Sequence, residues 1–285
     1  MIQKAVSIIG RLPTPVRRAT ALIIGLGLIL IPNQAARITR RNIQMAFPER
    51  RAWSRFWLIN ASLIELVQKS FDIAATWVRS PEQIVDWVQA SEGLTEFLQT
   101  PATTPKLILL PHLGNWELFG MWLSQYQSYT ALFRPLRADA LTALVRTARG
   151  RGGNELVSTD SAGLRQLMSA LRLGATVIVL PDQTPHAGQG VYVPFFGIQT
   201  LTPTLIARLI QKTKPHVFIA AAVREGSSYK AMIERVEILD SVPNTVEICR
   251  RMNLIIESLV RRYPTQYQWE YRRFRNAPDG SLRYP

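Results

Sequence analysis

The residues best suited to chemistry lie directly after a predicted buried strand at residues 107–111. His112, Gly114, Asn115 and Glu117 follow this strand, and a helical pattern begins in the same stretch. Ligands bind beyond the carboxyl ends of strands in open α/β sheets, so a site is expected in this loop. An imidazole that is held by a carboxylate can remove the proton of a hydroxyl group. Such a pair resembles the His–Asp part of a catalytic triad, with the nucleophile supplied by the substrate.

The spacing of His112 and Glu117 restricts how they can meet. On one continuous helix, residues five apart point about 140° away from each other, at about 100° per residue. The two side chains therefore meet only if His112 lies in the loop and Glu117 near the helix start. We predict that Glu117 accepts a hydrogen bond from one imidazole nitrogen and leaves the other nitrogen as the base. The alternative is an ordinary histidine in a strand-end loop, because this spacing often arises by chance.

Apolar strands that alternate with amphipathic helices must position this loop. This alternation predicts an α/β fold, an αβα layered domain with a mostly parallel central sheet. The predicted strands are 107–111, 129–133, 154–158, 175–181, 216–224 and 229–238. The predicted helices are 53–79, 115–126, 138–152, 161–174, 203–213 and 244–262.

The two ends of the chain carry its excess positive charge. The net charge is +14, yet residues 61–249 are neutral as a whole. A basic surface of this kind suits an anionic partner such as anionic lipid, an acidic carrier protein or nucleic acid. A solvated basic surface without a specific partner is the alternative.

An apolar run at residues 19–32 lies between basic residues near the N-terminus. It is short for a spanning helix, which needs about 20 apolar residues. A short membrane anchor, an interfacial segment beside anionic headgroups, a signal peptide and a buried core helix all fit the pattern. We expect retained membrane contact. We therefore assign residues 1–40 to a membrane-associated helical segment and residues 41–285 to the catalytic domain.

The composition argues against several classes of protein. One cysteine and three histidines give no disulfide framework and disfavour a Cys/His zinc site. The sequence has no Gly-x-Ser-x-Gly elbow, which argues against a serine lipase or esterase. Aromatic residues do not interleave with the basic runs, so nothing resembles a nucleic-acid-binding module. We expect no metal, no redox cofactor and no nucleic acid partner.

The HLGNWE stretch at residues 112–117 resembles the His-x4-Asp/Glu motif of the lysophospholipid acyltransferase superfamily. It is more similar still to the bacterial lipid A late acyltransferase branch, the lauroyl and myristoyl transferases. The resemblance covers about residues 40–276, with further similar blocks in the same order. These blocks are NIQMAFPE (42–49), LFRPL (132–136), RTARGRGG (146–153), LPDQ (180–183), GVYVPFFG (190–197), TLTPTLIARLIQKT (200–213) and QWEYRRFRN (268–276).

The resemblance implies transfer of a fatty acyl chain to a hydroxyl of a membrane glycolipid, most directly a lipid A precursor. It implies catalysis at the cytoplasmic face of the bacterial inner membrane, with the chain peripheral or held by a single N-terminal anchor. The implied donor is an acyl-acyl carrier protein; the sequence leaves acyl-CoA open. Carried over by motif, the catalytic residues are His112, Glu117, Arg149 and Asp182. The sequence departs from the family at Ala138, near the place where an Asn commonly follows the Arg-Pro segment.

Several side chains near these motifs are candidates for substrate binding. They are Asn115, Arg134, Gln183, Phe195 and Phe196. Arginine can bind phosphate or a developing oxyanion, or can form a structural ion pair. Asn115 can donate to the thioester oxygen or cap the following helix. The two phenylalanines can line an acyl channel or belong to the core.

Two other functions fit parts of the sequence. One is an acyltransferase with another lipid acceptor, such as a lysophospholipid, a mannosylated glycolipid or an ornithine lipid. The other is a non-enzymatic lipid-binding protein in which the basic ends make the contact.

Overall fold

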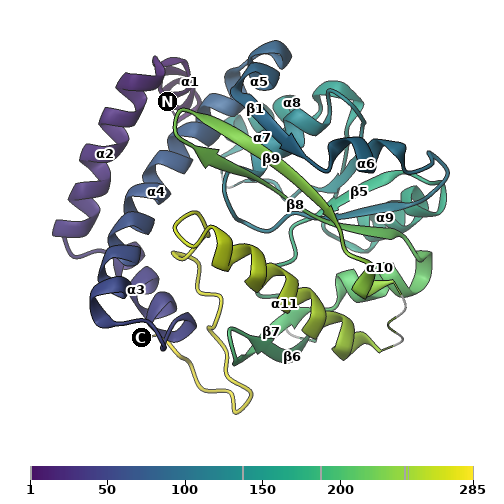
Figure 1. Cartoon of the computed structure of the whole chain (residues 1–285). Coiled ribbons are helices and arrows are strands. Elements are labelled where there is room, and N and C mark those ends of the chain that lie inside the picture. Colours follow the sequence, from purple (N-terminus) through teal and green to yellow (C-terminus); the bar gives the residue numbers. More distant parts are fainter. Residues whose placement is uncertain (1, 137, 187, 241, 243, 285) are drawn as a thin grey trace.

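The computed structural model describes residues 2–136, 138–186, 188–240, 242 and 244–284. The strands in these residues are β1 (Val88–Glu92), β2 (Lys106–Leu109), β3 (Thr130–Leu132), β4 (Glu155–Val157), β5 (Thr176–Val179), β6 (Gly190–Phe195), β7 (Ile198–Pro203), β8 (His216–Glu225) and β9 (Ser228–Arg235). The helices are α1 (Ile2–Arg11), α2 (Thr14–Leu30), α3 (Gln34–Ala46), α4 (Ala52–Val78), α5 (Pro81–Trp87), α6 (Leu94–Gln99), α7 (Trp116–Leu123), α8 (Asp139–Arg149), α9 (Ser161–Arg172), α10 (Leu205–Thr213) and α11 (Thr245–Arg262) (Figure 1).

A mostly parallel sheet forms the centre of the molecule. Within the described ranges it has seven strands in the order β1-β9-β8-β2-β5-β3-β4. Strands β8, β2, β5, β3 and β4 are parallel to one another, while β9 runs antiparallel to β8 and pairs in parallel with β1. Strands β6 and β7 form a separate antiparallel hairpin. The prediction of an α/β domain with a mostly parallel sheet is confirmed.

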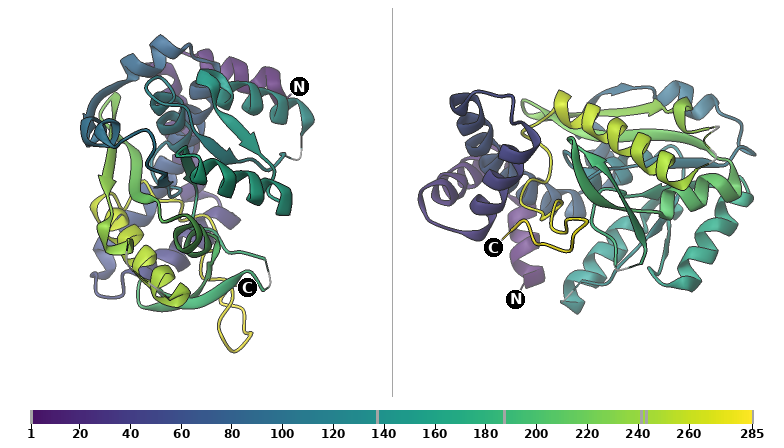
Figure 2. Two further views of the ribbon diagram at one scale, coloured as in Figure 1. Left: turned by 90° about the vertical axis from the view of Figure 1, so that its right-hand side faces the viewer. Right: turned by 90° about the horizontal axis from the view of Figure 1, so that it is seen from below.

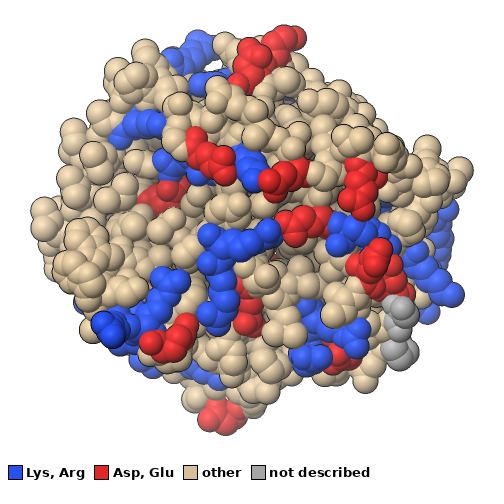
Figure 3. Space-filling view, in the orientation of Figure 1, with Lys and Arg blue, Asp and Glu red and all other residues tan. Residues whose placement is uncertain are grey.

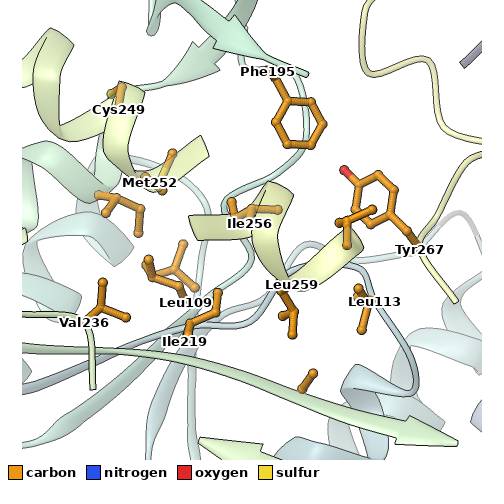
Figure 4. Close-up of a cluster of buried hydrophobic side chains, with 14 of the residues drawn as sticks. Leu109, Leu113, Phe195, Ile219, Val236, Cys249, Met252, Ile256, Leu259 and Tyr267 are labelled. Atoms are coloured by element: carbon orange, nitrogen blue, oxygen red, sulfur yellow. The ribbon is translucent and has the colours of Figure 1, made fainter. Parts of the chain in front are cut away.

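Helices cover both faces of the sheet because the buried strands are apolar on both sides. Leu107 and Leu109 of β2 belong to the hydrophobic cluster that includes α9, α10 and α11. Ile108 and Leu110 belong to the opposite cluster, with α5, α6 and α7. Figure 4 shows the first cluster, where Leu109 packs near side chains of α11. Successive residues of a strand point to opposite faces, which produces this division.

The N-terminal helices α1 to α4 gather at one side of the sheet domain (Figure 2). Helix α2 packs along α4, where Ala21 and Gly25 are buried. The buried Arg17 Nε donates to Asp72 Oδ1 at 2.9 Å, and the Tyr229 hydroxyl donates to the other carboxylate oxygen at 2.7 Å. This network fixes α2 to α4 and β9. Residue 40 lies inside α3, so the boundary assigned there does not coincide with a break in the fold.

The outer face of α2 is apolar and exposed. The side chains of Ile23 and Leu30 are 70% and 80% exposed. Figure 3 shows few charged side chains at the left edge of the molecule, where α2 lies. No single helix in the described residues has both the length and the apolar character needed to cross a bilayer. Helices α1 and α2 meet those requirements as a pair, but they are bent by 119° at their junction.

Candidate active site

The loop after β2 is held where its backbone passes close to the backbone of β8. Gly114 has φ +61°, and a Cβ at this position would lie 2.0 Å from the Ala222 carbonyl oxygen. The Gly114 N–H donates to the Gln266 carbonyl at 3.0 Å, and the Asn115 N–H donates to the Ala222 carbonyl at 2.8 Å. Only glycine adopts this conformation in this space without strain. The loop is therefore held between β8 and the C-terminal segment, which we define as residues 263–284.

Asp182 is the carboxylate that holds His112. The imidazole Nδ1 lies 2.8 Å from Asp182 Oδ1, and the His112 backbone N–H donates to Asp182 Oδ2 at 2.9 Å. The two residues meet because they follow β2 and β5, which are neighbouring parallel strands whose carboxyl ends lie at the same edge. Asp182 is only 2% exposed. Burial raises the pKa of its carboxyl, but the electrostatic interaction with His112, the two hydrogen bonds from that residue and the charge of Arg273 outweigh burial and leave the pKa below its usual value.

The second imidazole nitrogen, Nε2, lies beside the Gln183 side chain. An ionised carboxylate only accepts hydrogen bonds, so Nδ1 carries the hydrogen toward Asp182 and Nε2 presents a lone pair. The Gln183 amide nitrogen lies 3.2 Å from Nε2 and 3.3 Å from the Gln268 Oε1 atom. The imidazole side chain is 14% exposed, and its ring meets the Trp116 ring edge-on. This arrangement can accept a proton from a hydroxyl group that enters the loop.

The prediction that Glu117 orients the imidazole is wrong. Glu117 instead forms a bidentate ion pair with Arg149, in which Nε donates to Oε2 at 2.9 Å and Nη2 donates to Oε1. The Trp77 Nε1–H donates to Oε2 at 3.1 Å. Helix α7 begins at Trp116, so Glu117 lies in its first turn and is directed toward α4 and α8.

The Glu117–Arg149 pair is buried and remains charged. Burial raises the pKa of the Glu117 carboxyl. The charge of Arg149 and the hydrogen bonds from Arg149, Trp77 and Trp116 outweigh burial and lower this pKa below its usual value. Burial lowers the pKa of Arg149, and Glu117 outweighs this effect and raises it. A carboxylate held in this way does not exchange protons with a substrate at neutral pH. Its role is to fix the guanidinium.

The arginine assignment within the RTARGRGG block is supported by the geometry. Arg149 reaches Glu117, whereas Arg151 donates to the carbonyl oxygens of Arg79 and Trp77. Arg146 lies 5.3 Å from the centre of the Phe133 ring. Among these three arginines, Arg149 is the one that pairs with Glu117 in the described part of the chain.

Three of the predicted substrate contacts do not hold. Asn115 is fully buried, its amide oxygen accepts from the Leu118 N–H at 3.0 Å and its amide donates to Thr76 at 3.0 Å. It caps α7 and does not face a substrate. Phe195 and Phe196 are buried in an aromatic cluster with Tyr267, Phe47 and Trp269, so they are core residues.

The remaining two predicted contacts are compatible with the structure. Gln183 lies beside the imidazole, as described above. Arg134 is exposed on the segment after β3, and it makes no hydrogen bond or ion pair with another described residue. Its contact with substrate stays a prediction. Ala138, where the sequence departs from the family pattern, precedes the first residue of α8.

A small apolar cavity of about 30 Å³ adjoins the buried ion pair. Its walls include Trp116, Gly120, Tyr129, Leu180 and Arg149. The structure also brings Trp77 and Gln268 to the site, which sequence reasoning missed. Gln268 opens the QWEYRRFRN block, so its family pattern was a usable signal, whereas nothing in the sequence singled out Trp77. No group of three or more His, Cys, Asp or Glu side chains that could hold a metal ion occurs among the described residues.

Comparisons with known proteins identify the family of the chain. The family model for bacterial lipid A biosynthesis acyltransferases matches residues 3–276. A lipid A biosynthesis acyltransferase of Haemophilus influenzae is 25% identical over 253 residues, which cover 87% of this chain and 80% of the relative. The lipid A biosynthesis palmitoleoyltransferase of Escherichia coli is 24% identical over 85% of this chain and 79% of its own. The lauroyltransferase of the same organism is 21% identical over 95% and 89%. This chain therefore belongs to the bacterial lipid A biosynthesis acyltransferase family.

Proposed function

We propose that the protein is an O-acyltransferase that moves a fatty acyl chain from an acyl thioester to a hydroxyl of a lipid A precursor. The single observation that carries the proposal is the His112 imidazole, held by buried Asp182 through Nδ1, which leaves Nε2, beside Gln183, as the acceptor nitrogen. The names of the relatives support lipid A as the acceptor class. An acyl-acyl carrier protein is the proposed donor, and no metal or redox cofactor takes part.

The proposed step is one proton transfer coupled to acyl exchange. His112 Nε2 takes the proton of the acceptor hydroxyl, and the oxygen attacks the carbonyl carbon of the thioester. The new carbon–oxygen bond gives a tetrahedral oxyanion. When this intermediate collapses, the carbon–sulfur bond breaks, and the leaving thiolate takes the proton from the imidazolium. Asp182 stabilises the imidazolium between these transfers.

Arg149 is the proposed donor to the oxyanion. Two of its guanidinium nitrogens bind Glu117, and Nη1 has no partner among the described side chains and backbone groups. The Arg149 side chain is 24% exposed and lines the apolar cavity. A fixed charge that points at a developing oxyanion stabilises the transition state strongly because it needs no reorganisation. In this view Glu117 is a positioning residue.

The apolar cavity beside Arg149 is the proposed place for the first methylenes of the acyl chain. Its volume of about 30 Å³ corresponds to about one water molecule, so the rest of the chain must extend beyond it. The lack of a side chain at Gly120 leaves part of this cavity open between α7 and the Tyr129 ring. A Cβ at this position would lie 2.7 Å from the Tyr129 hydroxyl oxygen.

Membrane contact is proposed for the apolar face of α2 and for the start of α4. Trp53, Phe56 and Trp57 form a stacked and edge-to-face cluster there, and each is more than half exposed. Aromatic residues concentrate at membrane interfaces. We propose that the protein works at the cytoplasmic face of the bacterial inner membrane, as a peripheral protein or with an N-terminal anchor. The acidic carrier would then dock on the basic surface.

The test is acyl transfer with purified components. Wild-type protein with a lauroyl or myristoyl acyl-acyl carrier protein and a lipid A precursor should yield an acceptor heavier by one acyl chain in mass spectrometry. His112→Ala should abolish the product while its circular dichroism and melting temperature stay close to wild type. A lysophospholipid offered in parallel separates the two acceptor classes. A folded His112→Ala protein with wild-type transfer would refute the assigned base.

A further inference from the structure

A pocket of about 300 Å³ between α3 and the C-terminal segment is lined mainly by arginine. Arg37, Arg40 and Arg41 contribute from α3, and Arg272 contributes from the C-terminal segment. No acidic residue of the described ranges lines it. We call it the arginine pocket. It is separate from the cavity at Arg149, because the two share no lining residue.

The guanidinium groups of the arginine pocket lack anionic partners among the residues that the structure describes. None of the four makes a side-chain hydrogen bond or ion pair with any described residue, although Arg272 lies over the Tyr284 ring at 6.0 Å. Some exposed arginines elsewhere are paired, as Arg250 is with Glu247 at 2.6 Å. Like charges around one cavity repel each other, and a bound anion relieves that repulsion.

The walls of the pocket are fixed before any ligand binds. The buried Asn42 amide of α3 donates to the carbonyl oxygens of Trp269 and Tyr271, at 2.7 and 2.8 Å. The Tyr284 hydroxyl donates to the Asn42 amide oxygen and accepts from the Phe274 N–H. These bonds tie α3 to the C-terminal segment, so the backbone positions that carry the arginines are fixed before a ligand binds.

The location of the pocket identifies the anion. Helix α3 follows α2 directly, and α2 ends in the exposed apolar residues Leu30 and Ile31. Figure 1 shows the lower end of α2 beside α3, and Figure 3 shows basic side chains gathered in that part of the surface. A protein whose apolar face enters a bilayer places an adjoining polar rim at the level of the headgroups. Arginine binds phosphate through two parallel N–H donors.

We propose that the arginine pocket binds the phosphate of an anionic membrane phospholipid and so fixes the height and tilt of the enzyme on the bilayer. The proposal deepens the proposed function, since it rests on a membrane-bound acceptor, but binding is measured without turnover. The pocket is also close to the catalytic loop. The Gln268 N–H donates to the His112 carbonyl at 3.0 Å, and Arg272 follows four residues later, within about 14 Å along the chain.

The experiment is binding of the full-length protein to phosphatidylcholine vesicles with increasing phosphatidylglycerol, followed by flotation. The pocket variant is Arg37→Ala/Arg41→Ala. The matched control is Arg172→Ala/Arg208→Ala, which removes the same charge from exposed positions on α9 and α10. We expect the pocket variant to bind about 25-fold more weakly and the control to bind within about twofold of wild type, at about fivefold per arginine near an anionic surface. Equal losses in both variants would overturn the proposal.

A charge-preserving variant separates a phosphate site from diffuse attraction. Arg37→Lys/Arg41→Lys keeps the net charge but removes the guanidinium fork. Binding that stays well below wild type supports a phosphate site, whereas full restoration overturns it. Inorganic phosphate tests the other source of the same anion. At constant ionic strength, inorganic phosphate should weaken vesicle binding by the wild type and leave binding by the pocket variant unchanged. A wild-type protein that binds phosphate in the pocket yet keeps its vesicle affinity would overturn the lipid assignment.

Two further outcomes remain separable. If the pocket variant binds vesicles normally but needs more acyl-acyl carrier protein for transfer, the pocket belongs to the acidic carrier and our proposal is wrong. If the wild-type protein binds vesicles through the pocket but transfers no acyl chain, the proposed function fails and the pocket assignment stands. Melting temperatures of all variants must match wild type, because Asn42 and Tyr284 keep the walls in place in each.

Discussion

Asp182→Asn tests the catalytic pair more directly than removal of the histidine. The carboxylate accepts from both the backbone N–H and the Nδ1–H of His112. An asparagine can accept only through its oxygen, and the backbone N–H can only donate. The amide oxygen must therefore face the backbone, and its NH₂ group then faces Nδ1. The imidazole has to carry its hydrogen on Nε2, so the proposed base is lost.

The magnitude follows from these contacts. Loss of a charge-assisted hydrogen bond costs about 1.5–3 kcal/mol, or roughly 10- to 160-fold in rate. Reversal of the tautomer adds to this, and the same substitution in a serine-protease triad lowers kcat about 10⁴-fold. We expect kcat for acyl transfer to fall about 10²- to 10⁴-fold in Asp182→Asn. The imidazole ¹⁵N shifts of His112 should report the change from Nδ1–H to Nε2–H.

Glu117→Gln is the informative comparison. It disrupts the buried pair with Arg149, and such a loss typically costs about 3–5 kcal/mol of stability. The melting temperature should fall, while the tautomer of His112 stays as in wild type. A folded Asp182→Asn protein with wild-type kcat and an Nδ1–H imidazole would refute the reasoning. So would a Glu117→Gln protein whose imidazole changes tautomer.

Three further predictions follow from the same region. Gly114→Ala should lower the melting temperature and abolish transfer, because its Cβ would lie 2.0 Å from the Ala222 carbonyl oxygen; calorimetry that finds native stability would contradict the close approach. Gly120→Ala should lower kcat/KM for the acyl donor at least about tenfold, as expected when a methyl group intrudes into a substrate pocket beside Tyr129; unchanged donor kinetics would place the acyl chain elsewhere. Because the pKa of Asp182 is lowered in the folded state, its carboxylate stabilises the fold at pH values above about 3.9, its pKa in the unfolded chain. This stabilisation is lost as the pH falls through the folded-state pKa. Urea unfolding of wild type and Asp182→Asn should therefore converge at acid pH, and a constant difference between pH 7 and pH 3 would count against a stabilising Asp182 carboxylate.

The sequence could predict the layers of the fold and the edge that holds the site. The apolar strands at 107–111 and 175–181 and the helices after them carry strong local patterns. Ligands generally bind at the carboxyl ends of parallel strands, and for this reason His112 and Asp182 were each predicted to lie at the site. The order of the strands is a long-range property. Nothing local shows that β2 and β5 are neighbours, and therefore the meeting of these side chains could not be derived.

The error over Glu117 has the same origin. Its closeness to His112 in sequence suggested contact, but the direction of a side chain in the first turn depends on where the helix begins. Asn115 caps α7, and the carboxylate of Glu117 is thereby presented to Arg149 from α8. Both residues were named by the family motifs. A motif identifies residues and leaves their pairing undefined.

The aromatic VPFFG segment shows a second limit. Its apolar residues fit a substrate channel and a core equally well by composition. The structure shows a hairpin of β6 and β7 with Phe196 at φ +51° in its turn, and both phenylalanines enter the core. Burial of a hairpin depends on what covers it, here Trp269 and Tyr267 from the C-terminal segment. That information lies some 70 residues away in the chain.

Helix α4 has a mechanical consequence. Its 27 residues extend about 40 Å at 1.5 Å per residue. One end carries the exposed Trp53 cluster, and the other end supplies Trp77 to the Glu117 carboxylate and Thr76 to the cap of α7. A continuous helix of this length is stiff, so it fixes the distance between the exposed aromatic cluster and the Glu117–Arg149 pair. In the proposed membrane orientation, the length of this one helix would set the height of the reaction centre above the lipid and the part of the acceptor that it reaches.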